Sequence, residues 1–184
     1  AGRTSQGNYG IAIGFYSGNN TQATQAIAIG GYAGETNQSQ SAVAIGYYAA
    51  KTRQDTNAIA IGTAAAQTDQ SLNSIAIGNN AGYSNQGTQS VAIGYKAGET
   101  NQHSNTIVLN AGGTSLNTSD TSGLYISPVR ETGYSSQGVL YYNSSTKEIT
   151  YDLSKVGVAT GDDLSLSSLD LSGTFKIQKR SVKP

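Results

Sequence analysis

Ile-Ala-Ile-Gly occurs at residues 11–14, 27–30, 59–62 and 75–78, and Val-Ala-Ile-Gly occurs at 43–46 and 91–94. The copies follow one another at a constant 16-residue interval without slippage. A seventh stretch, Ile107-Val108-Leu109, keeps the interval but ends at Asn110 instead of a glycine. A short repeat of fixed length is typical of a solenoid, in which each repeat forms one coil that stacks on the next.

Within each copy a large β-branched residue alternates with alanine, which is the two-residue period of a β-strand. The glycine that follows permits a positive φ or a close backbone approach at a corner. The polar residues after it are typical of a further corner. The pattern predicts an all-β fold, a parallel β-roll or solenoid of 16-residue coils. Two columns of identical residues define it: Gly14, Gly30, Gly46, Gly62, Gly78 and Gly94, and Gln6, Gln22, Gln38, Gln54, Gln70, Gln86 and Gln102.

The two faces of the strands differ in side-chain size. We expect the isoleucines to fill the inside of the coils and the alanines to line the outside, where a second chain could approach closely. A rod one coil wide encloses little apolar volume to offset an ordering cost of about 1.5 kcal/mol per residue. The sequence therefore predicts that the chain forms an oligomer.

The Ala-Ile-Ala-Ile-Gly and Ser-Val-Ala-Ile-Gly repeats, with Ala-Gly at residues 81–82 and 97–98, resemble the head repeats of trimeric autotransporter adhesins, the YadA-like heads. The resemblance covers residues 5 to about 110. It implies a left-handed parallel β-roll, with three chains side by side, that binds host surfaces.

A second resemblance covers roughly residues 105–153. The stretches Ile107 to Asn110, Leu124 to Arg130, Val139 to Asn143 and Glu148 to Tyr151 are similar to a module of surface and fibre proteins of large DNA viruses, the chlorovirus type being the nearest. This resemblance implies a virion-associated protein.

The sequence divides into three parts. We expect the β-roll head over residues 1–110, a β-strand neck or trimerisation module over 111–153, and a weakly specified tail over 154–184. Residues 138–152 read as a β-hairpin within the neck, and Pro128 indicates that the strand before it lies at a sheet edge or beside a break. The expected assembly is an intertwined homotrimer.

Composition excludes several functional classes. The 184 residues include 11 Lys or Arg, 11 Asp or Glu, one His and no Cys, so the formal net charge is zero. The chain has no basic patch for nucleic acid, no apolar run long enough for a membrane span and no Cys-ligated metal site. We expect no catalytic residues, metal or cofactor. Glu35 with Lys51 and Arg53 with Asp69 are expected to form surface ion pairs, and His103 to be a solvated corner residue.

Three sets of side chains could form binding surfaces. Aromatic residues follow the corner glycines and could stack on sugar rings or line subunit contacts; the candidate binding residues are Tyr16, Tyr32, Tyr48 and Tyr95. The glutamine column could bind sugars, although stacked amides that bond one another are the favoured interpretation. A threonine column could bind ice, but Arg53 and Asp69 lie beside it; the column comprises Thr4, Asn20, Thr36, Thr52, Thr68, Ser84 and Thr100.

The sequence thus predicts a non-enzymatic homotrimeric surface fibre or spike domain that mediates attachment to, or display at, a host surface. The expected partners are two further copies of the chain and host cell-surface or cell-wall polysaccharide, and the expected location is a virion or an extracellular surface. The alternative is an inert trimeric spacer that presents a neighbouring receptor-binding or cell-wall-degrading domain. An ice-binding solenoid is a minor alternative.

Overall fold

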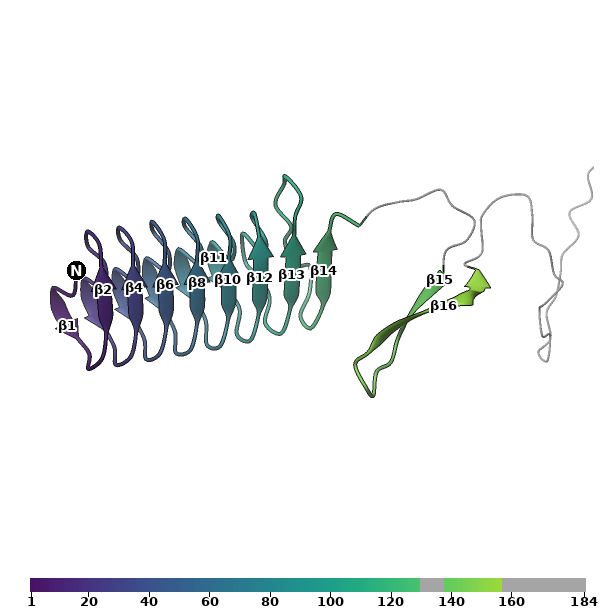
Figure 1. Ribbon diagram of the computed structural model, residues 1–184, viewed down its shortest axis with the longest axis horizontal. Coiled ribbons are helices and arrows are strands. Elements are labelled where there is room, and N and C mark those ends of the chain that lie inside the picture. Colours follow the sequence, from purple (N-terminus) through teal and green to yellow (C-terminus); the bar gives the residue numbers. More distant parts are fainter. Residues whose placement is uncertain (130–137, 157–184) are drawn as a thin grey trace, which may run out of the picture. The chain divides into compact units, whose positions relative to one another are not determined.

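A computed structural model of the chain describes residues 1–129 and 138–156. The chain divides into two units, Ala1–Arg130 and Glu131–Pro184. Strands are the only regular elements of the described residues, and the first unit is a parallel β-solenoid built from two sheets (Figure 1). The predicted all-β class and the 16-residue coil are therefore confirmed.

One sheet has six parallel strands, each of which starts at the threonine column. Its strands are β1 (Thr4–Gln6), β3 (Asn20–Gln22), β5 (Thr36–Gln38), β7 (Thr52–Gln54), β9 (Thr68–Gln70) and β11 (Ser84–Gln86). Each glutamine pairs with the glutamine of the next coil, as Gln38 does with Gln54.

The other sheet has eight parallel strands and contains the Ile-Ala-Ile stretches. Its strands are β2 (Ile11–Ile13), β4 (Ile27–Ile29), β6 (Val43–Ile45), β8 (Ile59–Ile61), β10 (Ile75–Ile77), β12 (Val91–Gly94), β13 (Ile107–Asn110) and β14 (Leu124–Ser127). Seven intervals of about 4.8 Å make this sheet about 34 Å long.

The structure reverses the predicted orientation of the strand faces. Ala28, Ala44 and Ala60 are fully buried, whereas Ile27 and Ile29 are only partly buried. The expectation that isoleucine fills the coil and alanine faces another chain was therefore wrong. The reason is the narrow interior, since each coil must also enclose a glutamine from the six-stranded sheet. Only a methyl group fits beside that side chain.

The corner glycines have a backbone conformation that other residues rarely adopt. Their φ values lie between 113° and 131° from Gly14 to Gly94. A Cβ at Gly46 would lie 2.5 Å from the carbonyl oxygen of Gly62 in the next coil. Glycine is thus required here both by conformation and by space.

The solenoid continues past Asn110, where the 16-residue interval stops. β14 pairs in parallel with β13, with Leu124 opposite Ile107, and forms the edge of the eight-stranded sheet. The intervening residues 111–123 form an enlarged loop. Pro128 follows β14 directly, which agrees with the edge position predicted from that proline.

The second unit contains an antiparallel pair, β15 (Gly138–Tyr142) and β16 (Ile149–Val156). Residues 143–148 connect the two strands, close to the hairpin predicted over 138–152. The predicted tail over 154–184 lies outside the described residues from residue 157 onwards.

Candidate functional site

The outer surface of the eight-stranded sheet consists of two uninterrupted columns of large aliphatic side chains, which we call the aliphatic face. One column is Ile11, Ile27, Val43, Ile59, Ile75, Val91, Ile107 and Leu124, and the other is Ile13, Ile29, Ile45, Ile61, Ile77, Ile93, Leu109 and Ile126. None of them is fully buried, and Ile13, Ile93 and Ile126 are 59%, 41% and 48% exposed. A hollow of about 320 Å³ lies at its end, beside Leu109, Ile126 and Pro128.

Five aromatic rings gather at the corner that follows β2, β4 and β6. This cluster, the aromatic ridge, contains Phe15, Tyr16, Tyr32, Tyr47 and Tyr48. The Tyr16 and Tyr32 rings stack with centroids 5.6 Å apart and an interplanar angle of 8°, and the Tyr48 centroid is 5.0 Å from that of Tyr32. Phe15 and Tyr47 are 65% and 51% exposed.

The ridge forms because the corners stack in register. The amide of Tyr32 donates to the carbonyl of Phe15 in the preceding coil, and the amide of Tyr48 donates to that of Gly31. Of the four predicted binding tyrosines, three are brought together here. Tyr95 lies three coils beyond Tyr47 in the same column, where Lys96 Nζ is 5.6 Å from its ring centroid.

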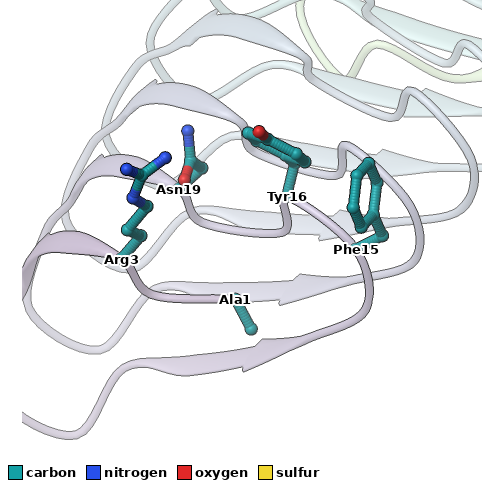
Figure 2. A pocket seen from close by; sticks show the side chains of 5 residues that line it. All are labelled: Ala1, Arg3, Phe15, Tyr16 and Asn19. Carbon is teal, nitrogen blue, oxygen red and sulfur yellow. The ribbon is translucent and has the colours of Figure 1, made fainter.

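A polar column runs beside the ridge. The sequence predicted its Glu35–Lys51 ion pair but not the column as a whole. It comprises Arg3, Asn19, Glu35 and Lys51, one residue from each of four successive coils. Lys51 Nζ lies 4.9 Å from the Tyr48 ring centroid and 3.8 Å from Glu35 Oε2. Arg3 and Asn19 line a hollow of about 340 Å³ with Phe15 and Tyr16 (Figure 2). The constant interval was the signal that could have revealed this column.

The glutamine column is internal and cannot present an array to a ligand. The side chains from Gln22 to Gln102 are at most 2% exposed, although Gln6 in the first coil is exposed. Gln38 Nε2 donates to the carbonyl of Ile27 at 2.7 Å and to Gln54 Oε1 at 3.1 Å, and the other coils repeat this pattern. The interpretation that stacked amides bond one another is confirmed.

Charged groups near the corners form the ion pairs that the sequence predicted. Lys51 pairs with Glu35, and Arg53 Nε lies 3.0 Å from Asp69 Oδ1. The Arg53–Asp69 pair lies in the outer surface of the six-stranded sheet, next to the threonine column. Exposed charges bind water strongly, so this surface lacks the even, weakly hydrated array that the ice-binding alternative needs.

Other candidate groups have structural partners. His103 Nδ1 lies 2.8 Å from Thr118 Oγ1, which also accepts a hydrogen bond from the His103 amide. The described residues contain no group of three or more His, Cys, Asp or Glu side chains that could hold a metal ion. No helix among them is long and apolar enough to cross a membrane.

Neighbouring groups raise the pKa values of two surface side chains, Tyr47 and Lys96. A hydrogen bond with Tyr48 is the main reason that the pKa of Tyr47 lies above its ordinary value. A hydrogen bond to Glu99, with Nζ and Oε1 3.1 Å apart, raises the pKa of Lys96. Both effects reflect surface contacts, and neither indicates a catalytic group.

No protein-family model, curated protein or solved structure matches the chain.

Proposed function

We propose that the chain is a non-enzymatic homotrimeric domain of a surface fibre or spike, which attaches to or is displayed at a host surface and is associated with a virion. The aliphatic face is the observation that supports this proposal. Soluble monomers rarely expose a large continuous apolar patch, and such patches mark interaction sites.

Burial of the aliphatic face would supply the apolar burial that the interior of the coil lacks. The interior contains mainly alanine methyl groups and glutamine amides, so each coil buries little apolar surface by itself. Apolar burial contributes roughly 25 cal/mol per Å². Side-by-side packing of parallel rods through their aliphatic faces would bury two columns from every chain at once. The number three is taken from the resemblance to the adhesin heads.

The mass in solution tests the assembly. Light scattering should give three times the 18.9 kDa of one chain. The mass of a single chain at micromolar concentration would rule out the trimer. Twice the mass of one chain would instead indicate two rods packed face to face.

An inert spacer remains the second candidate. The observation that favours it is the glutamine ladder, the buried part of the glutamine column from Gln22 to Gln102. This ladder consists of side-chain bonds from coil to coil between Gln22 and Gln102, which stiffen that part of the solenoid along its axis. Stiffness suits a domain that holds another domain away from a surface.

Co-sedimentation distinguishes attachment from spacing. The 184-residue chain is mixed with intact cells, or with isolated cell wall, and the bound fraction is measured. Saturable binding supports attachment. If a longer protein that contains this chain binds and the chain alone does not, the spacer is the correct interpretation.

A further inference from the structure

We infer that the aromatic ridge, together with the polar column beside it, is a binding site for an acidic saccharide, a chain of uronate sugars. This inference rests on the proposed attachment function and assigns it to particular side chains. It concerns a different surface of the rod from the aliphatic face.

The ridge offers exposed ring surfaces to a ligand. Phe15 and Tyr47 pack edge-on against Tyr32, at interplanar angles of 81° and 80°, and more than half of each side chain stays exposed. The C–H groups of a pyranose ring form an apolar face that packs on such rings. Tyrosine adds a hydroxyl group that can bond to sugar hydroxyls.

The hollow at the first coil brings polar groups to these rings. Its volume of about 340 Å³ is at the small end of the range for ligand sites. The Phe15 and Tyr16 rings meet at 73°, and the side chains of Arg3 and Asn19 lie alongside (Figure 2). Within the part of the chain that the structure describes, neither the Arg3 guanidinium nor the Asn19 amide has a hydrogen bond or an ion pair. Both are available to a ligand.

Charge favours an acidic sugar over a neutral one. The guanidinium of Arg3 can donate two parallel hydrogen bonds to a carboxylate. At the other end of the ridge, Lys51 Nζ lies 4.9 Å and 5.8 Å from the centroids of Tyr48 and Tyr32. Arg3 and Lys51 are three coils apart, which is about 14 Å. Among the four residues beside the ridge, Glu35 is the single carboxylate, so these four residues have a net charge of +1.

Calorimetry with soluble oligosaccharides tests the inference on the intact 184-residue chain. The probe is trigalacturonate, and its methyl ester is the uncharged counterpart. We expect saturable binding of trigalacturonate and at least fivefold weaker binding of the ester. The preference should shrink as the salt concentration rises, because salt screens exposed charges.

Two pairs of variants separate the contributions. Arg3→Gln should lower the affinity for trigalacturonate about tenfold and leave that for the ester unchanged, whereas Arg53→Gln on the six-stranded sheet should change neither. Tyr47→Ala should weaken both ligands about fivefold, whereas Tyr95→Ala, in the same column three coils away, should not. Circular dichroism checks that each variant keeps the fold.

The inference is overturned if the wild-type chain does not bind trigalacturonate, if the ester binds equally well, or if Tyr95→Ala and Tyr47→Ala weaken binding equally. Each isotherm reports the affinity for a soluble ligand, and one chain contributes all residues of the ridge, so binding does not depend on the number of chains. A failure here therefore differs from a failure of the proposed trimer, which the mass in solution tests, and of cell attachment, which co-sedimentation tests.

Discussion

Single residues decide whether a coil can close, and their conformations repeat from coil to coil. Tyr16, Tyr32 and Tyr48 all have φ values between 53° and 59°, a left-handed conformation that residues with a side chain adopt at some cost. The corner glycines have φ values well beyond that region. The sequence predicted the glycine corners correctly, because glycine is the only residue that recurs there.

Substitution of a corner glycine should be far more damaging than substitution of a glycine just after a corner. For Gly46→Ala we expect a loss of at least about 2 kcal/mol in the free energy of unfolding, from backbone strain together with the close contact to Gly62. Gly31→Ala is the matched control. Its φ is not positive, and its nearest neighbour is the movable ring of Tyr47 at 3.2 Å. Urea denaturation measures both, and similar losses would contradict the account of the corner.

A buried glutamine of the ladder should contribute far more to stability than an exposed glutamine. Gln54→Leu keeps the size of the side chain but removes donors to Val43, Ala58 and Gln70. Gln70 Oε1 then has no donor in a buried site, so we expect a loss of about 3 kcal/mol. Gln40→Leu, at an exposed position, should cost under about 0.5 kcal/mol. Equal melting temperatures for Gln54→Leu and the wild type would show that the buried amides contribute nothing to stability.

The Tyr47 ring should respond to pH in a defined direction. Its pKa is raised in the folded state, so the contact with Tyr48 stabilises the fold at pH values below the ordinary tyrosine pKa. This stabilisation is lost as the pH rises through the raised value. Tyr48→Phe removes the hydrogen bond and should return the pKa of Tyr47 towards its ordinary value. An NMR titration of the ring carbons measures this, and an unchanged midpoint would argue against the hydrogen bond.

At the scale of elements, the strands were easier to predict than their faces or their number. The alternation of large and small residues located each Ile-Ala-Ile strand. It does not show whether the large or the small residues point inward. Side-chain size decides which face points inward, because the Gln38 side chain already occupies the interior beside Ala28. The last strand, β14, was not recognised as part of the roll. Leu124 lies one residue beyond the regular interval from its partner Ile107, and an enlarged loop separates the two strands.

The enlarged loop depends on Asn110, which stands where the other coils have glycine. Its amide nitrogen donates to the carbonyls of Tyr95 and Thr114 at 2.7 Å, and its oxygen accepts from the amide of Gly112 at 3.0 Å. Asn110→Ala removes all three bonds from a buried site. We expect hydrogen exchange to accelerate in residues 111–127 while β4 to β8 remain protected, since coils interact mainly with their neighbours.

Asn79→Ala is the control for this prediction, because the Asn79 side chain is exposed. It should leave the exchange rates of the loop unchanged. Uniform acceleration along the whole rod in Asn110→Ala would mean that the solenoid unfolds as one cooperative unit, and the loop would then have no separate anchor.

At the scale of the whole molecule, the binding surfaces were only partly predictable. The sequence indicated that the tyrosine corners face outward, and the structure unites Tyr16, Tyr32 and Tyr48 in one ridge. It did not indicate the polar column with Arg3 and Lys51. Nor did it identify the aliphatic face, because we assigned the large residues to the interior. The polar column and the aliphatic face were both missed for the same reason. The 16-residue interval shows which residues stack along the rod, but it does not show which columns are neighbours around the coil or which point outward.

A charge in the middle of the aliphatic face should dissociate the proposed trimer without unfolding the chain. In Ile61→Asp the carboxylate would have to be buried without a partner in the trimer, which is costly, whereas in a single rod it would face water. We expect the mass in solution to fall from that of three chains to that of one, with the strand signal in circular dichroism retained. Thr52→Asp, on the other sheet, should remain trimeric.

The response to salt and temperature identifies the force that would hold the proposed trimer together. Contacts through the two aliphatic columns of each chain should persist in concentrated NaCl, because the side chains of the aliphatic face carry no charge. They should weaken on cooling, as burial of apolar surface does. Dissociation by salt, with no effect of cooling, would place the contact on the charged corners instead. The aliphatic face would then need a different partner to cover it.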